Sequence, residues 1–375
     1  MLKKEKTTTM KSDSSALYIH IPFCKYICTY CDFKKFVYNQ ERVDKYFWAL
    51  FEQIKELKEN KYKTIYIGGG TPSCIDYKNL EELLKRVNQL LDDDYKEFTI
   101  ECNVENINSK FLALIVKYGV NRLSIGIQTF NDKYINLCGR KHTKEMAIKN
   151  VLLASTYLNN ISVDMIYAFK DQTIDELIED INVVCSLPIK HLSYYSLVIE
   201  DNTILKMKHY ENVDDKTQAK MYKTICKQLK KWRFYRYEIS NFSKYGKYQS
   251  KHNLVYWHNF HYDAIGLASS GYKANLRYKN NDNILRYIDK DFSFSEKIIL
   301  NKQDMMFEEI MLRLRLDEGL DISYFNQKYD CDFQTLYKDA IAENLKLKLI
   351  SLKKGKIKTT FKGSLLLNSV LERFM

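Results

Sequence analysis

Proline, glycine and long apolar segments are scarce in this chain. Only 3 prolines and 12 glycines occur among 375 residues, and no apolar run approaches the roughly 20 residues that a membrane-spanning helix needs. The first six residues, Met-Leu-Lys-Lys-Glu-Lys, lack the apolar core of a secretion signal. The nine cysteines are an odd number, so without such a signal a disulfide framework is not expected. These absences exclude a membrane-spanning protein and a secreted disulfide scaffold, and they predict a cytoplasmic protein.

The composition is that of a globular protein with a basic surface. Lysine and arginine total 59 and aspartate and glutamate 47, giving a net charge of +12, while 45% of residues are hydrophobic and 28% charged. The length allows one large domain and a smaller one, each with its own core. Lysines spread along the chain are typical of a solvated surface, although they also permit peripheral contact with an acidic membrane surface.

Short β-rich runs alternate with amphipathic helical runs through the first half of the chain. Such alternation predicts parallel strands joined by right-handed crossovers. The predicted fold class is therefore α/β, with a partial (β/α)6 barrel of the TIM type. The predicted strands cover residues 17–21, 64–67, 98–101, 122–126, 162–167 and 191–198, and the predicted helices cover 43–57, 80–91, 109–117, 143–158 and 174–187.

The last 75 residues have a different pattern. Three predicted helices (303–315, 322–328 and 335–345) precede a predicted hairpin at 347–360, which together resemble a winged-helix domain. Residues 344–363 contain seven lysines and no acid; a solvated hairpin is the simpler interpretation, and nucleic acid is not an expected partner. The predicted organisation is a tail at 1–15, a barrel domain at 16–245, a connecting segment at 246–300, and a mostly helical, winged-helix-like C-terminal domain at 301–375.

Three cysteines crowd onto one predicted loop directly after the first strand. Cys24, Cys28 and Cys31 follow the spacing Cys-x3-Cys-x2-Cys. Three thiolates on a short loop suit three corners of an iron–sulfur cube and leave the fourth iron open to a chelating amino-carboxylate ligand. A zinc site completed by His20 is an alternative, although the strand pleat should point His20 into the barrel. Buried structural cysteines are a second alternative.

The sequence around these cysteines resembles the motif of a known family. Residues 18–24 are Tyr-x-His-Ile-Pro-Phe-Cys and residues 28–33 are Cys-x-Tyr-Cys-Asp-Phe. The segment resembles the radical S-adenosylmethionine (SAM) superfamily and, within it, the oxygen-independent coproporphyrinogen III oxidase family, being most similar to the heme chaperone HemW branch. The resemblance spans residues 16–375. It implies a [4Fe–4S] cluster on the three cysteines, bound SAM, a one-electron donor, and the capacity to form a 5′-deoxyadenosyl radical.

A glycine triple follows the second predicted strand. Residues 68–73 read Gly-Gly-Gly-Thr-Pro-Ser, which allows close backbone approach to a ligand but lacks the Gly-Lys-Ser/Thr ending of a phosphate loop. The resemblance places Gly69, Gly70 and Thr71 against the methionyl part of SAM.

Polar side chains also stand at the ends of later predicted strands, where barrels hold their ligands. They are Glu101, Asn103, Gln128 and Asp164; a satisfied core polar group or a helix cap is the alternative for each. Arg140 could clamp a carboxylate with its bidentate guanidinium. The resemblance assigns nucleotide or substrate-side contacts to Tyr18, Tyr30, Glu101, Gln128, Arg140 and Asp164.

A second motif separates two branches of the resembled family. Residues 252–257 read His-Asn-Leu-Val-Tyr-Trp, which matches the His-Asn-x-x-Tyr-Trp signature of the heme chaperones. His252 or, more weakly, Tyr256 could ligate heme iron, with His258 and His261 as competitors; the alternative is an aromatic core patch with a hydrogen-bonded histidine. The resembled oxidases carry a fourth cysteine where this chain has Phe33.

The resemblance therefore implies a heme chaperone that binds heme and transfers it to respiratory acceptor proteins. The alternatives are an oxidase that decarboxylates coproporphyrinogen propionates, and a zinc-stabilised nucleic-acid-binding module. Two family segments depart from their pattern. The expected Gly-Leu-Pro-x-Gln reads Ala-Phe-Lys-Asp-Gln at 168–172, and the expected Gly-x-Gly-x-Gly-Ala segment reads Ala-Ile-Gly-Leu-Ala-Ser-Ser-Gly at 264–271. Lost glycines predict that a second nucleotide or the heme is held differently or not at all.

Overall fold

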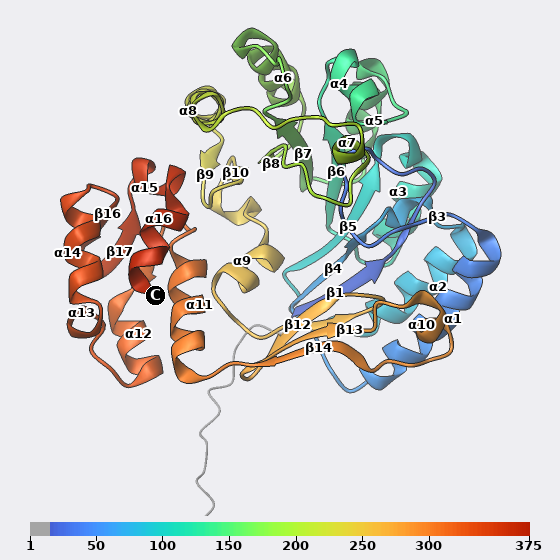
Figure 1. Cartoon of the computed structure of the whole chain (residues 1–375). Helices are drawn as coiled ribbons and strands as arrows, with labels where there is room; N and C mark the ends of the chain where they lie inside the picture. Colours follow the sequence, from blue (N-terminus) through green and yellow to red (C-terminus); the bar gives the residue numbers. More distant parts are fainter. Residues whose placement is uncertain (1–15) are drawn as a thin grey trace, which may run out of the picture.

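A nine-stranded sheet forms the centre of the larger domain in the computed structural model, which describes residues 16–375 (Figure 1). The predicted tail lies outside the described residues. In spatial order the strands are β11 (Asp263–Ile265), β1 (Ala16–Ile21), β4 (Thr64–Gly69), β5 (Glu97–Asn103), β6 (Arg122–Gln128), β7 (Ile161–Tyr167), β8 (His191–Ser196), β10 (Asn241–Ser243) and β9 (Tyr235–Arg236).

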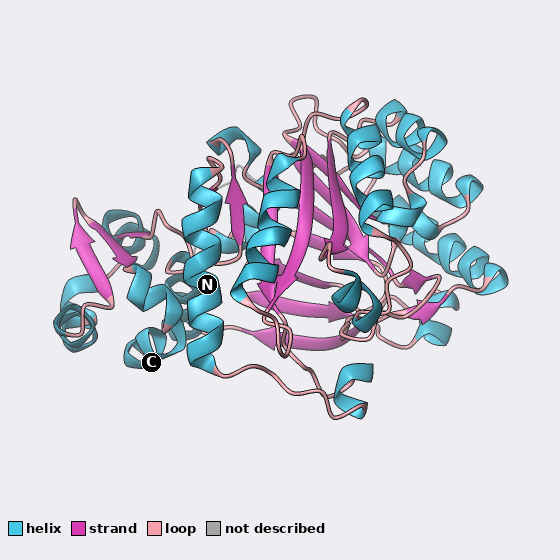
Figure 2. Cartoon of the chain, turned by 90° about the horizontal axis from the view of Figure 1, so that it is seen from above, coloured by secondary structure: helices cyan, strands magenta, loops and turns pink. Residues whose placement is uncertain are grey.

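Strands β11 to β8 run parallel, whereas β10 and β9 are antiparallel additions at the far edge. All six predicted strands are present in the predicted order, and β11 and β9 are left as open edges within residues 16–375. The partial α/β barrel is thereby confirmed, and its opening is visible from above in Figure 2. Strands β9, β10 and β11 are not predicted from the sequence, because they are only two or three residues long and carry too little periodicity.

Amphipathic helices cover the outer face of the sheet, because their apolar residues recur at helical spacing. In α2, for example, Leu80, Leu83, Leu84 and Val87 are buried, and the Asp76 side chain caps the first turn. The helices are α1 (Gln40–Glu56), α2 (Tyr77–Asn88), α3 (Ser109–Lys117), α4 (Asp132–Leu137), α5 (Lys144–Ser155), α6 (Ile174–Ser186), α7 (Ile204–Met207) and α8 (Asp215–Lys231).

The segment at 246–300 is part of the barrel domain rather than a free connection. Helix α9 (Lys251–Trp257) packs on β4, β11 pairs with β1, and α10 (Ile284–Ile288) packs on α1. Ile265, Leu267 and Tyr287 belong to the same hydrophobic core as β1. A second sheet on this segment contains β12 (Ser270–Lys273), β13 (Leu276–Asn280) and β14 (Phe294–Ile299).

A separate hydrophobic core holds the C-terminal domain together, running from Met306 to Phe374. Its helices and a three-stranded sheet of order β15-β17-β16 give the helix-plus-hairpin arrangement that the sequence predicts. The elements are α11 (Lys302–Arg313), β15 (Leu320–Asp321), α12 (Ile322–Tyr329), α13 (Phe333–Leu336), α14 (Lys338–Lys346), β16 (Ile350–Lys353), β17 (Lys356–Thr359), α15 (Phe361–Leu365) and α16 (Leu367–Leu371).

Ion pairs join the two domains along the segment that follows α11. Arg236 and Asp317 are 2.6 Å apart, and Arg315 lies 3.6 Å from the buried Glu238. His258, which caps α9, pairs with Glu318 at 2.6 Å. Helix α9 consequently lies between the barrel and α11 (Figure 1). Among residues 16–375, no helix is long and apolar enough to cross a membrane.

Candidate functional site

Strand alternation directs a set of polar side chains into the barrel. Within β5, β6, β7 and β8, register pairs Glu101 with Ser124, Gly126 with Asp164, and Asp164 with Ser193. Because these strands are parallel, their carboxyl ends meet at one edge, as the strand-end argument predicts.

A cavity of about 440 Å³ opens at that edge, a volume within the ordinary range for small-molecule sites. The structure brings twelve of the predicted site residues to its wall. They are Cys24, Cys28, Tyr30, Cys31, Gly69, Gly70, Thr71, Glu101, Asn103, Gln128, Arg140 and Asp164. Tyr18, His252 and Tyr256 are not among the lining residues.

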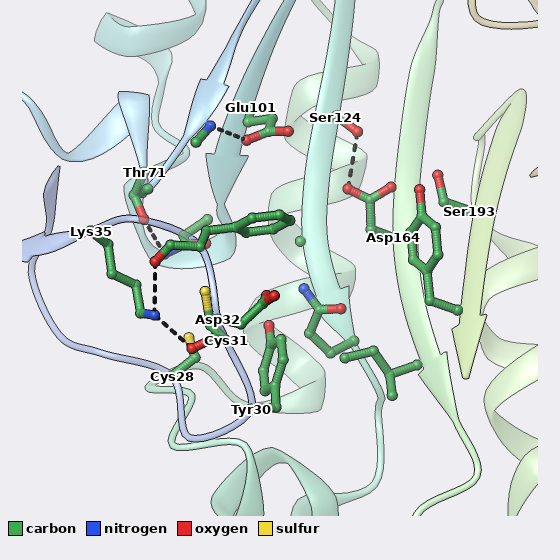
Figure 3. Close-up of a pocket in the computed structure, with 18 of the residues that line it drawn as sticks. Cys28, Tyr30, Cys31, Asp32, Lys35, Thr71, Glu101, Ser124, Asp164 and Ser193 are labelled. Atoms are coloured by element: carbon green, nitrogen blue, oxygen red, sulfur yellow. Dashed lines mark hydrogen bonds between the residues drawn. The ribbon is translucent and has the colours of Figure 1, made fainter. Parts of the chain in front are cut away.

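All three cysteines line the cavity from the segment after β1. Figure 3 shows the side chains of Cys28 and Cys31 at its wall. Strand β2 (Phe23–Cys24) pairs with β3 (Phe36–Val37) and closes this loop at its base. Thr71 Oγ1 donates to Cys24 Sγ at 3.4 Å, and Arg140 Nη1 donates to Cys28 Sγ at 3.5 Å. Lys35 Nζ donates to the carbonyl oxygen of Cys31 at 2.6 Å. Each cysteine therefore has a donor directed at its sulfur or backbone, an environment that favours thiolates once a metal displaces their protons.

Burial raises the pKa of two of these thiols. It raises the pKa of Cys24 to about 11 and also raises the pKa of Cys31, while the Lys35 ammonium acts in the opposite direction on both. Cys24 and Cys31 must therefore lose their protons to a metal to bind it, since cysteine ligates soft metals as the thiolate.

The zinc alternative is not supported, because His20 is engaged elsewhere. Its Nε2 is 3.0 Å from the carbonyl oxygen of Lys34, and its Nδ1 is 3.0 Å from the Tyr18 hydroxyl. Within residues 16–375, no three His, Cys, Asp or Glu side chains are grouped tightly enough to enclose a single ion. A cube carries its irons at separate corners, so its thiolates need not converge on one point.

Glycine is required at the triple for packing against the first strand. Gly69 has φ +116°, and a Cβ there would lie 2.5 Å from the His20 ring. A Cβ at Gly70 would lie 2.7 Å from the carbonyl oxygen of Phe23. Gly70 N and Thr71 N then donate to the carbonyls of Ile21 and Phe23, both at 2.8 Å. The glycines thus hold this loop against the cysteine loop, in addition to lining the cavity.

Two partly buried carboxyls, those of Glu101 and Asp164, line the cavity (Figure 3). Glu101 Oε1 accepts from the Tyr66 hydroxyl at 2.6 Å, and Oε2 accepts from Gly69 N at 3.0 Å. The pKa of Glu101 is raised to about 7. Burial is the main cause and the nearby Asp164 also raises this pKa, while the two donors lower it. Burial likewise raises the pKa of Asp164, which accepts from Ser124 Oγ at 3.1 Å. Both carboxyls can accept hydrogen bonds from hydroxyls of a bound nucleotide.

Arg140 lines the cavity and is also bonded to the protein at two of its nitrogens. Its side chain is only 5% exposed, and Nη1 and Nη2 donate to Cys28 Sγ and to the carbonyl oxygen of Gly126. Only Nε is left without a partner in the described residues. Arg140 therefore ties the cysteine loop to β6, and because three of its five N–H groups are left over at the cavity wall, the carboxylate clamp stays a prediction. Gln128 adopts φ +77° at an irregularity between β6 and β7, which turns its side chain toward the cavity.

Tyr18 lies behind the cavity wall. Its ring stacks on Tyr66 with centroids 6.1 Å apart, and its hydroxyl bonds His20. Tyr66 lines the cavity and Tyr18 does not, so the nucleotide contact of Tyr18 stays a prediction.

The expected heme ligands are core residues in this structure. His252 is 0% exposed; Nδ1 is 3.0 Å from Thr64 Oγ1, and Nε2 is 2.6 Å from the Tyr256 hydroxyl. Both nitrogens and the phenol are thus paired with each other or with the sheet, and the axial-ligand expectation for His252 and Tyr256 is not met in this conformation. His258 is paired with Glu318, and His261 packs against Tyr272.

Two alanines that stand in the departing family segments adopt a backbone conformation typical of glycine. Ala168 has φ +67° and Ala268 has φ +57°, the left-handed region that favours glycine. The loops keep a conformation that glycine would allow, and the altered binding of a second nucleotide or of the heme stays a prediction.

Sequence reasoning missed several lining residues. Tyr66, Ser193 and Tyr195 alternate inward from strands that were correctly predicted, so extending the alternation rule along each strand could have found them. Lys35 and Asn253 reach the cavity from a loop and from α9, and no sequence signal placed them there.

Comparisons with known proteins agree with this geometry. Residues 18–184 match the model of the Radical SAM superfamily, and residues 300–366 match the HemN C-terminal domain. The chain is 36% identical to the heme chaperone HemW of Lactococcus lactis subsp. lactis, covering 98% of both chains. It is 33% identical to the heme chaperone HemW of Bacillus subtilis, covering 96% of this chain and 98% of that one. The solved coproporphyrinogen III oxidase HemN of Escherichia coli is 20% identical, with a TM-score of 0.84 over 96% of this chain and 90% of its own, which shows a shared fold.

Proposed function

The chain belongs to the radical SAM superfamily and, within it, to the family of the heme chaperone HemW, and from that premise we propose that it binds heme and transfers it to acceptor proteins. Relatives that match it from end to end carry this proposal, since both domains and the segment between them are shared. The similarity to the oxidase extends to the fold alone.

The superfamily implies a [4Fe–4S] cluster and SAM, and the residues present suit both. Three thiols border one cavity, with Thr71 and Arg140 donating to two of the sulfurs. When bound, the pair supplies one-electron cleavage of a sulfonium. The chain's own part is to hold the nucleotide with Glu101 and Asp164, and to anchor the cysteine loop through Arg140. A one-electron donor would dock where Phe33, which is 64% exposed, borders the same loop.

Heme binding at the His-Asn-x-x-Tyr-Trp motif would require α9 to move away from β4. His252 has no accessible nitrogen while α9 is packed on β4. The ion pair of His258 with Glu318 links this helix to the C-terminal domain. We therefore propose a closed form, which is the one in this structure, and an open form that presents His252. All nine cysteines are free thiols, which suits action in the reducing cytoplasm.

Heme titration of the anaerobically reconstituted protein tests this proposal. The wild type should bind one equivalent of heme with a defined absorbance change, and His252→Ala should lose it. His209→Ala, a change at an exposed histidine remote from the motif, is the matched control.

Two results would contradict the proposal. One is the absence of saturable heme binding in the wild type. The other is formation of protoporphyrinogen from coproporphyrinogen in the presence of SAM and a reductant, which would assign the oxidase activity instead. Unchanged binding in His252→Ala would remove only that residue from the ligand role.

A further inference from the structure

One tyrosine bridges the cavity and the motif helix. Tyr66 is on β4, lines the cavity, and packs its ring on His252 with centroids 5.3 Å apart at an interplanar angle of 32°. Its hydroxyl bonds Glu101, so the same side chain contacts both the motif histidine and a cavity carboxyl. Tyr66 is not among the site residues that the sequence predicts.

On the cavity side, Tyr66 determines how Glu101 is oriented. Its hydroxyl donates to one carboxylate oxygen at 2.6 Å, and Gly69 N donates to the other at 3.0 Å. A Cβ at Gly68 would lie 2.8 Å from both the Tyr66 ring and the Glu101 carboxyl, so the three groups are closely packed. Burial and the neighbouring carboxyls raise the pKa of Tyr66, which keeps the phenol protonated and able to donate.

On the opposite side, the Tyr66 ring rests on the structure that holds α9. His252 bonds Thr64 on the same strand and Tyr256 one turn along the helix. The Glu97 carboxylate accepts from Lys251 N at 2.8 Å and from His252 N at 3.2 Å, fixing the start of α9. Displacing His252 would remove one face of the packing around Tyr66.

We propose that Tyr66 is a positioning residue that orients Glu101 toward SAM and couples that site to α9. SAM binding and the packing of α9 on β4 then favour each other. Opening of α9 leaves Tyr66 less ordered, and SAM binding to the open form must then restore that order. The involvement of heme rests on the proposed function, because heme is the ligand expected to stabilise the open form. By linkage, heme and SAM then weaken each other's binding by the same factor.

A double-mutant cycle tests the coupling without heme. SAM affinity is measured by equilibrium dialysis on reconstituted wild type, Tyr66→Phe, Tyr256→Phe and the double variant. Tyr66→Phe keeps the ring but removes the hydrogen bond to a charged acceptor, so SAM should bind about tenfold more weakly. Tyr256→Phe, which leaves His252 Nε2 unpaired, should cost about threefold in the wild-type background and nothing in the Tyr66→Phe background.

The pH profile separates positioning from simple filling of the core. Because the Tyr66 hydroxyl lowers the pKa of Glu101, its removal should move the pH midpoint of SAM binding upward. Asp164 and Arg122 also face Glu101, from β7 and β6, and both are retained in the variant. Tyr95→Phe removes a hydroxyl bonded to the Gly119 carbonyl, away from the cavity, and should change neither affinity nor midpoint.

Heme supplies the second arm of the experiment. Saturating heme should weaken SAM binding to the wild type by about fivefold or more, and Tyr66→Phe should abolish this effect while still binding heme. Additive effects in the cycle with an unmoved pH midpoint would overturn the proposal. A wild type that binds no heme would contradict the proposed function, and the cycle would still decide the coupling. Cluster absorbance and melting temperature verify that each variant is folded.

Discussion

The two ends of the barrel interior use the same kinds of residue for opposite purposes. At the carboxyl end of the strands, Glu101 and Asp164 border an open cavity beside three thiols. At the amino end, Glu97, His191 and His252 are at most 1% exposed. Their polar atoms are hydrogen-bonded to other residues of the protein. His191, for instance, contacts Ser162 Oγ at 2.7 Å and the Tyr237 hydroxyl at 2.8 Å.

The difference shows that inward polar residues do not by themselves mark a ligand site. The amino end is filled because α9 lies across it and supplies the donors that Glu97 requires. The carboxyl end is left open because loops, rather than a helix, follow those strand ends. Under the proposed function, the motif at the filled end needs a conformational change to bind heme, whereas the open end needs none to bind SAM.

The largest expected effect is at the open end. Replacing Cys28 by serine should abolish the cluster, since a hydroxyl is a poor substitute for a soft thiolate. Iron and acid-labile sulfide should fall to background, and SAM binding should be lost with them. Cys226→Ser, on α8 outside the cavity, is the control and should retain full iron content. Equal iron in the two variants would refute the cluster assignment.

Glu97→Ala should produce the next largest effect, and it should be on stability. Its carboxylate accepts from Ser250 Oγ and from two amides of α9, so removal leaves buried donors without partners. A loss of about 3 kcal/mol in the free energy of unfolding is expected from urea denaturation. Glu97→Gln, which keeps one acceptor oxygen, should lose less. If Glu97→Ala instead lost iron without losing stability, Glu97 would belong to the ligand-binding end of the barrel and the comparison of the two ends would be wrong.

Acid should destabilise the filled end through His252. Burial lowers the pKa of this imidazole to about 3, against about 6.5 in the unfolded chain. The unfolded state therefore binds more protons below pH 6.5, and this contribution to stability is present above pH 6.5 and lost as pH falls toward 3. Between pH 7 and pH 5 it amounts to about 2 kcal/mol.

Buried carboxyls with raised pKa values, such as Glu101, act in the opposite sense, so the comparison between proteins is decisive. The decline in the urea midpoint from pH 7 to pH 5 should be smaller in His252→Gln than in the wild type. His209→Gln, at an exposed site, should retain the wild-type decline. An identical decline in all three proteins would show that His252 is not held neutral.

The smallest effect is expected from Thr71→Val. The change removes the hydroxyl that donates to Cys24 Sγ and accepts from Asn103 Nδ2, at a stability cost of about 1 kcal/mol. Hydrogen bonds to ligand sulfur raise a cluster's reduction potential, so the variant should be harder to reduce in a dithionite titration. Thr99→Val, whose hydroxyl bonds Glu97 at the other end, should leave that titration unchanged.

Local pattern was sufficient for most of the open end. Alternation and the cysteine spacing predicted the strands and loop that carry Cys24, Glu101 and Asp164, because parallel strands necessarily bring their carboxyl ends together. The glycine triple was also located, although its packing against His20 and Phe23 was not foreseen. Those contacts join residues about fifty positions apart, and no local rule specifies them.

Tertiary structure decided which polar residues are free. His252 has the chemistry of an iron ligand, but Thr64 and Tyr256 occupy both of its ring nitrogens in this structure. Arg140 has the chemistry of a carboxylate clamp, and it also bonds Cys28 and Gly126. A side chain's chemistry is a property of the sequence, whereas its availability depends on which partners folding brings within hydrogen-bond distance. The amino acids by themselves thus determined the barrel, the thiol set and the nucleotide edge, and only packing decided that the motif histidine is closed off and that Tyr66 lies between it and the cavity.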